Sequence, residues 1–140
     1  MIPPRSPYSL IQEDLWGEPH YEWRILVSCM LLNQTTRRQA EKVMPEFFRR
    51  WPQPRLLAKA DPVEIAELIG CLGFVRRRTL NLKKMTSGYL SGSWTHAREL
   101  YGIGDYGAAA WEIFCKGTLP DDCPKDHALT LYWKWRKKHS

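Results

Sequence analysis

The stretch Leu100–Ala109 has residue types and spacing suited to binding a phosphate; it reads Leu-Tyr-Gly-Ile-Gly-Asp-Tyr-Gly-Ala-Ala. Glycines at 102 and 104 permit a positive φ and a close approach of the backbone to a partner. If a helix begins near Asp105, the amides of Gly104, Asp105 and Tyr106 lie at its N-terminus, where unpaired N–H groups and the helix dipole attract an anion. Ile103 would anchor the turn in the core. An ordinary turn between helices with a glycine cap fits the same residues.

Basic side chains precede this turn, on the expected polar side of a helix over Val75–Leu90. They are Arg76, Arg77, Arg78, Lys83 and Lys84. Such side chains can neutralise DNA phosphates, although a run of charge on a helix is usually a solvated face. The formal net charge of +6 and the pI of about 9.3 favour a polyanionic partner.

A carboxylate stands at the start of the last expected helix, in Pro124-Lys125-Asp126-His127. Aspartate is a favoured helix N-cap, so Asp126 has a structural role available to it. The helix dipole and the nearby amides also favour the ionised form of such a carboxylate.

The four cysteines are widely spaced, at Cys29, Cys71, Cys115 and Cys123, and no Cys-x-x-Cys pair exists. Neither a zinc knuckle nor a disulfide framework is indicated, and we expect free, buried thiols. No apolar run approaches the roughly 20 residues that a membrane-spanning helix needs.

The elements that must position these residues read almost entirely as helix or loop. The expected helices are Tyr8–Trp16, Tyr21–Leu32, Arg37–Trp51, Pro62–Ile69, Val75–Leu90, Asp105–Lys116 and Asp126–His139. Tyr21–Leu32 is apolar almost all round, which predicts a central buried helix. Pro45 should kink its helix or reset the start. We predict an all-α chain, with a Pro-rich linker over residues 1–7 and a single domain over 8–140.

The turn resembles the hairpin of a helix-hairpin-helix motif, with Tyr101 in place of the usual proline. Together with Ser6–Glu13, Leu32–Thr36 and Pro124–His127, it resembles helix-hairpin-helix DNA glycosylases, in particular the glycosylase domains of methyl-CpG-binding mismatch-specific thymine/uracil glycosylases. The resemblance covers essentially the whole chain, in order and with similar spacing. It implies an all-α helix-hairpin-helix fold and a monofunctional, nuclear, monomeric enzyme that removes thymine or uracil mispaired with guanine from double-stranded DNA.

The resemblance also assigns the residues of the reaction. Asp126 matches the family's catalytic aspartate, whose charge would oppose the positive charge that develops on the sugar. Gln12 and Tyr106 match the pocket residues that contact the flipped base. Bifunctional relatives have a Schiff-base lysine at the position of Tyr106, so no strand cleavage is expected.

For DNA binding, the resemblance places Gln34 where the family has an arginine wedge and Phe74 at a second plug position. Gly102, Ile103, Gly104 and Asp105 of the hairpin, together with Arg77, would hold the DNA backbone. No metal is implied, and no iron–sulfur cluster, because the four closely spaced C-terminal cysteines that bind one in other members are missing.

Purely structural roles also fit several of these residues. Gln12 could lie on the surface, Tyr106 could only pack the hairpin, and Phe74 could be a buried loop anchor. Two other functions also fit the sequence. A non-catalytic helix-hairpin-helix DNA-binding module would need neither Asp126 nor a pocket, and Gln34-Thr35-Thr36 is typical of adenine-type mismatch glycosylases.

Overall fold

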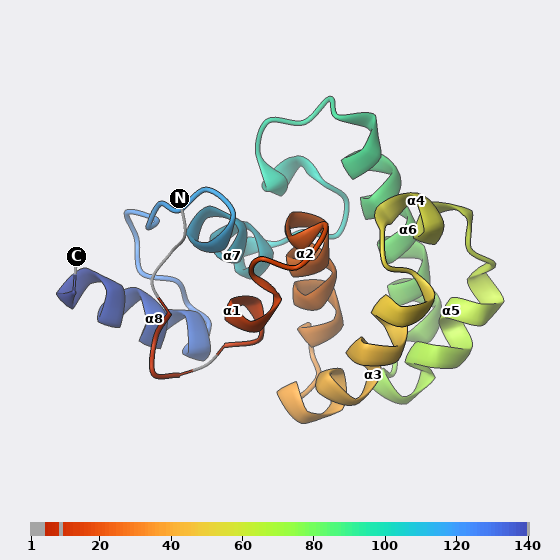
Figure 1. Ribbon diagram of the computed structural model, residues 1–140, viewed down its shortest axis with the longest axis horizontal. Coiled ribbons are helices and arrows are strands. Elements are labelled where there is room, and N and C mark those ends of the chain that lie inside the picture. The colour runs from red at the N-terminus through yellow and green to blue at the C-terminus, as the bar shows by residue number, and fades with distance from the viewer. Residues whose placement is uncertain (1–4, 9, 140) are drawn as a thin grey trace.

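The computed structural model describes residues 5–8 and 10–139, and within them it confirms the all-α prediction (Figure 1). The α-helices are α1 (Ile11–Leu15), α2 (Tyr21–Leu32), α3 (Arg37–Arg50), α4 (Pro54–Lys59), α5 (Pro62–Ile69), α6 (Val75–Ser91), α7 (Asp105–Phe114) and α8 (His127–Lys138). Two 3-10 helices, η1 (Gly70–Leu72) and η2 (Ala97–Glu99), complete the described elements. None of the described helices is long and apolar enough to cross a membrane.

Helix α2 runs through the middle of the molecule, with α3–α6 on one side and α7 and α8 on the other (Figure 1). Trp23 and every residue from Ile25 to Leu31 are buried. A helix that is apolar almost all round can serve two cores at once. The prediction of a central buried helix is therefore confirmed, and α2 joins the two halves.

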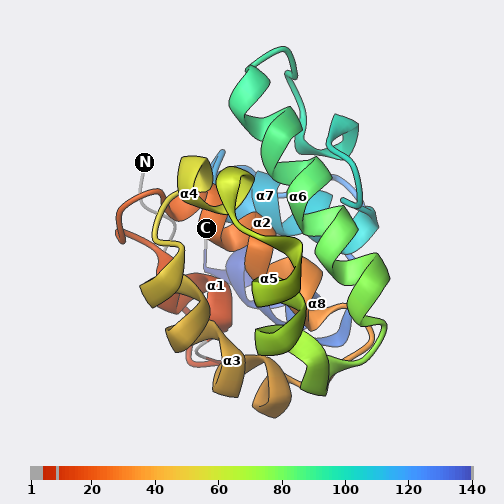
Figure 2. The ribbon, with the colours of Figure 1, turned by 90° about the vertical axis from the view of Figure 1, so that its right-hand side faces the viewer.

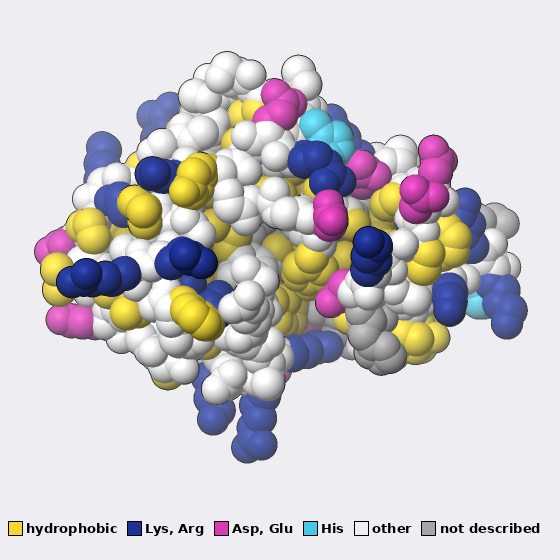
Figure 3. Space-filling view, turned by 180° about the vertical axis from the view of Figure 1, so that it is seen from behind, with side chains coloured by type: hydrophobic (Ala, Val, Ile, Leu, Met, Phe, Trp, Pro, Cys, Tyr) yellow, Lys and Arg dark blue, Asp and Glu magenta, His cyan; other side chains and the backbone are white. Residues whose placement is uncertain are grey.

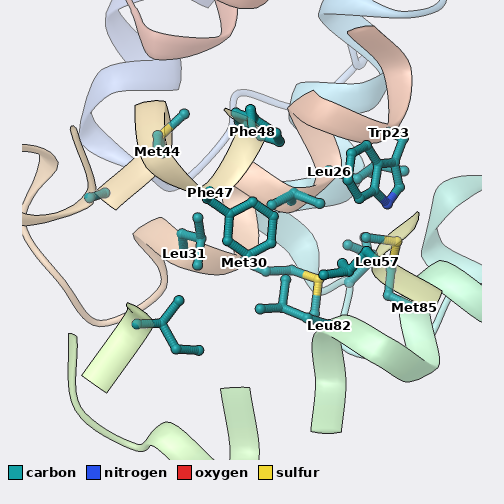
Figure 4. Close-up of a cluster of buried hydrophobic side chains, with 14 of the residues drawn as sticks. Trp23, Leu26, Met30, Leu31, Met44, Phe47, Phe48, Leu57, Leu82 and Met85 are labelled. Carbon is teal, nitrogen blue, oxygen red and sulfur yellow. The ribbon is translucent and has the colours of Figure 1, made fainter. Parts of the chain in front are cut away.

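The larger core lies between α2 and α3–α6 (Figures 2 and 4). Phe47 of α3 is fully buried there and makes an edge contact with Trp51, with ring centroids 5.0 Å apart. Trp23 of α2 meets Phe48 in the same way at 5.9 Å. Such aromatic edges add to the burial of Leu82 and Met85 on α6, so α6 is held firmly against α2.

The smaller core lies between α2, α7 and α8. Ile25 and Cys29 of α2 pack there with Phe114 of α7 and Tyr132 of α8. Helix α7 approaches α2 closely because its inner positions are small, and a Cβ at Gly107 would lie 3.8 Å from the Cβ of Cys29 on α2. This core positions the start of α7 and the start of α8 beside α2.

Several expected elements differ from the structure. Helix α1 is shorter than predicted, and no helix was predicted at α4. Pro45 does not reset α3, because Thr36 starts that helix by accepting a hydrogen bond from Gln39 N and the proline lies inside the uninterrupted helix. Cys71 and Cys123 are exposed, so the expected burial of all four free thiols is wrong for these two.

The segment before α1 is tied to that helix at Ser6. The Glu13 carboxylate accepts hydrogen bonds from Ser6 N at 2.5 Å and from Ser6 Oγ at 3.1 Å, and Ser6 is buried. Residues 1–4 of the predicted linker lie outside the described residues.

Candidate active site

A pocket of about 360 Å³ lies where α1, the end of α2, the start of α7 and the start of α8 meet. Gln12, Tyr106 and Asp126 all line it, although they come from three distant parts of the sequence. We call these three residues and the space between them the base pocket. Gln34 lies on its wall as well. The structure thus brings together the residues to which the resemblance assigned the chemistry.

Gln12 is buried, with only 2% of its surface exposed, so it is not a surface glutamine. Its Nε2 donates a hydrogen bond to Tyr106 Oη at 2.6 Å and lies 3.6 Å from Cys29 Sγ. Burial, followed by the neighbouring Cys29, raises the pKa of Tyr106, so its phenol is neutral at physiological pH. Burial raises the pKa of Cys29 to about 12. The pocket is therefore lined by neutral polar groups at this end.

Asp126 lines the same pocket, is exposed and caps α8. Its Oδ2 accepts a hydrogen bond from Leu129 N at 3.0 Å, which fixes the side chain at the helix start. A second pocket of about 670 Å³, lined by residues 120–126 and the start of α7, touches Asp126 and Tyr106 from the other side. The carboxylate and the phenol therefore stand between two hollows.

The hairpin at Leu100–Gly104 opens onto a pocket of about 270 Å³ next to the base pocket. Gly102 has a φ of 80°, and a Cβ there would lie 3.0 Å from Met30 Cε, so the turn requires glycine at this position. Gly104 has a φ of −94° and does not use the left-handed region. Ile103 is buried, as predicted. Among the described residues, no side chain caps α7, so the first backbone N–H groups of this helix face the hairpin without a capping partner.

The Asp105 carboxylate is exposed beside these amides and pairs with Arg98, with Nη1 and Oδ1 2.6 Å apart. The hydrogen bond from Arg98 holds the pKa of Asp105 below its usual value, so the carboxylate stays ionised. A phosphate at the hairpin would be repelled by this charge, and Arg98 offsets part of the repulsion.

Gln34 and Phe74 line a small shared pocket of about 80 Å³ together with Arg77 and Gly102. Both have a left-handed backbone, with φ of 59° at Gln34 and 47° at Phe74, a conformation uncommon for residues other than glycine. We call them the left-handed pair. Phe74 is 64% exposed, so it is not a buried loop anchor. Residues held in this region cluster at functional sites.

The basic run on α6 divides into exposed and internal members. Arg76, Arg77 and Lys84 are exposed, but Lys83 donates to the Ala60 carbonyl and Arg78 is only 7% exposed. Placing Arg78 on the polar side was therefore wrong. The signal was present in the sequence, because Arg78, Leu82 and Met85 follow each other at helical spacing and share the buried side of α6.

Cys29 is another residue that the sequence analysis did not assign to the site. It lies on the buried helix α2, with its Sγ 3.6 Å from Gln12 Nε2, and the apolar residues around it in the sequence indicated only a thiol in the core.

In the described part of the chain, no group of three or more His, Cys, Asp or Glu side chains could hold a metal ion. On the face seen in Figure 3, Lys and Arg side chains lie on both sides of a central hollow.

Comparison with known proteins adds to this geometry. Residues 27–130 match the model of the HhH-GPD superfamily base excision DNA repair proteins. The chain is 40% identical over 134 residues to a methyl-CpG-binding domain protein 4-like protein of Arabidopsis thaliana. The matched region covers 96% of this chain and 29% of that relative.

Two archaeal proteins are also similar. Identity is 38% over 98 residues to a thymine-DNA glycosylase of Aeropyrum pernix (65% of this chain, 44% of the relative). It is 34% over 106 residues to a thymine/uracil-DNA glycosylase of Pyrobaculum aerophilum (70% of this chain, 46% of the relative). The chain thus spans less than half the length of each of these relatives. These matches confirm the resemblance, and the chain belongs to the HhH-GPD superfamily of base excision DNA repair proteins.

Proposed function

We propose that this chain is a monofunctional DNA glycosylase that excises thymine or uracil mispaired with guanine, acting as a monomer on nuclear DNA. One observation carries the proposal: Gln12, Tyr106 and Asp126 line a single pocket beside the hairpin. The names of the two archaeal relatives support thymine and uracil as the bases.

In this proposal the hairpin amides and Arg77 hold the DNA backbone, and the target nucleotide turns out of the helix. Enzymes that act on a base inside a duplex must extrude it, and they identify it by hydrogen bonds to its polar edge and by stacking. The carbonyl oxygen of Gln12 offers an acceptor to an N–H of a pyrimidine, because the Nε2 of the same amide already faces Tyr106 Oη at 2.6 Å and Cys29 Sγ at 3.6 Å. Gln34 and Phe74 fill the space that the base leaves.

Asp126 supplies the catalytic charge. Breaking the N-glycosidic bond leaves positive charge on the sugar, as in glycoside hydrolysis, and a carboxylate fixed nearby stabilises that charge. The hydrogen bond from Leu129 N orients the carboxylate without a further side chain. The same carboxylate can orient the water that attacks the sugar, although stabilisation of charge is its main role.

The reaction stops at the abasic site because Tyr106 carries a phenol, which cannot form a Schiff base. The amine to test is that of Lys125, which lines the larger pocket beside Asp126. Borohydride added during excision should trap no covalent protein–DNA adduct, and the abasic strand should break only after alkali. An adduct that disappears in Lys125→Ala would show that the enzyme is bifunctional.

The decisive experiment is excision from matched duplexes that contain G·T, G·U, A·8-oxoG or only normal pairs, followed by alkali. We expect cleavage at G·T and G·U alone. Adenine release from A·8-oxoG would instead identify an adenine-type enzyme, a possibility raised by the Gln34-Thr35-Thr36 stretch. Binding to all duplexes without excision would identify a non-catalytic DNA-binding module.

A further inference from the structure

Arg78 is a buried cation whose hydrogen bonds all go to backbone carbonyls within the described residues. Its Nε donates to Gly73 O at 2.9 Å, Nη1 to Met30 O at 3.0 Å and Nη2 to Asn33 O at 2.6 Å. Burial lowers the pKa of this guanidinium. A buried charge is costly unless it is fully hydrogen-bonded, so the three carbonyls must stay in place to keep Arg78 there.

These carbonyls belong to the two segments that carry the left-handed pair. Gly73 directly precedes Phe74, and Asn33 directly precedes Gln34. Met30 and Asn33 are at the C-terminal end of α2, where the helix dipole also favours a positive charge. One guanidinium therefore binds both segments, although they are 40 residues apart by number (34 to 74).

The planar shape of the guanidinium makes this possible. Its N–H groups diverge in a rigid fork, whereas lysine has a single ammonium on a flexible stem. An ammonium at this position cannot replace three bonds to carbonyls on separate segments. The chemistry of the side chain, and not its charge alone, joins the segments.

We propose that Arg78 is a positioning residue that holds Gln34 and Phe74 together as one unit for displacing the target base. The inference rests on the proposed function for its role in excision, and its structural part can be tested without catalysis. Arg78 touches neither the base pocket nor DNA in this role; it acts through the left-handed pair.

The test compares Arg78→Lys with Arg24→Lys. Arg24 is the control because this half-buried guanidinium also donates to a backbone carbonyl, Pro52 O at 2.9 Å, away from both segments. In Arg78→Lys we expect faster amide hydrogen exchange at both residues 33–36 and 73–75 and single-turnover excision slowed about tenfold to a hundredfold, the range seen when positioning is lost. Arg24→Lys should change neither.

A coupling measurement gives the inference its sharpest test. In a Gln34→Ala/Phe74→Ala background, adding Arg78→Lys should slow excision no further, because residues acting through the same unit are not additive. An equal further loss in that background would overturn the inference, and so would unchanged exchange in either segment. If Arg78→Lys fails to fold, Arg78→Gln is measured in the same way. Should the parent protein excise nothing, the exchange result still decides the role of Arg78 while the proposed function fails separately.

Discussion

The base pocket and the left-handed pair are built by different means. In the base pocket, Gln12 is buried and donates to Tyr106, whereas the exposed Asp126 is held by a hydrogen bond from Leu129 N. In the left-handed pair, the side chains are exposed, and what sets their direction is the uncommon positive φ of the backbone. Changes in the pocket should therefore affect the chemical step, whereas changes in the pair should affect base displacement before it.

The largest effect is expected for Asp126→Asn. Asparagine keeps the size and most of the N-cap ability of aspartate, so α8 should still begin at His127. The variant loses the charge that opposes the sugar cation, and loss of one such preorganised group costs on the order of 10²–10³ in rate. Single-turnover excision and duplex affinity, measured on the same variant, check the prediction.

Affinity separates the two roles of this carboxylate. Duplex binding by Asp126→Asn should be retained or become tighter, because a carboxylate near phosphates repels them. Excision near the parental rate would mean that Asp126 is only a helix cap and that the base pocket contains no catalytic charge.

Gln12→Ala should have the next largest effect. The change removes the amide that contacts the base and leaves the buried Tyr106 hydroxyl without its donor, at a cost of about 1–3 kcal/mol. This corresponds to roughly one to two powers of ten in excision rate. Gln12→Met is the matched control for volume, and it should lose as much as alanine. Recovery in the methionine variant would show that the amide only fills space.

Phe74→Ala tests the other region. Phe74 is exposed and makes no core contact to lose, so the variant should keep the parental thermal stability. Stacking of a base on an aromatic ring is worth about 1–3 kcal/mol, and loss of it should slow excision from a paired duplex. Excision from single-stranded uracil DNA should be nearly unchanged, because no partner base must be displaced. Equal losses on both substrates would remove the distinction between the two regions.

Most of the helices could be predicted from the sequence for a physical reason. The nearly all-round apolar sequence of Tyr21–Leu32 identified α2, and Asp126 was recognisable as a helix cap from its residue type. The resemblance supplied the remaining information, since no local pattern links Gln12 to Tyr106 across 94 positions.

What the sequence analysis missed depends on tertiary contacts. Arg78 looked like one more member of a basic run, and only the fold shows that Gly73, Met30 and Asn33 surround it. The left-handed backbones of Gln34 and Phe74 were equally hidden, because neither residue type prefers that region. The resemblance thus named the residues of both regions, whereas the left-handed backbone of the pair could be seen only in the fold.

The smallest effect is expected for Arg77→Ser, a change beside the left-handed pair that should alter only the salt dependence of DNA binding. Arg77 is exposed beside Gln34 and Phe74, one position before the buried Arg78. If it neutralises one phosphate, the log–log slope of affinity against salt should become shallower by about 0.9, with little loss of specificity for the mismatch. Arg55→Ser on α4, an exposed arginine away from these pockets, is the control and should leave the slope as it was. Titration of duplex binding between low and moderate salt measures both. A slope unchanged in Arg77→Ser would place Arg77 on a solvated face and leave the hairpin amides as the backbone contact beside the pair.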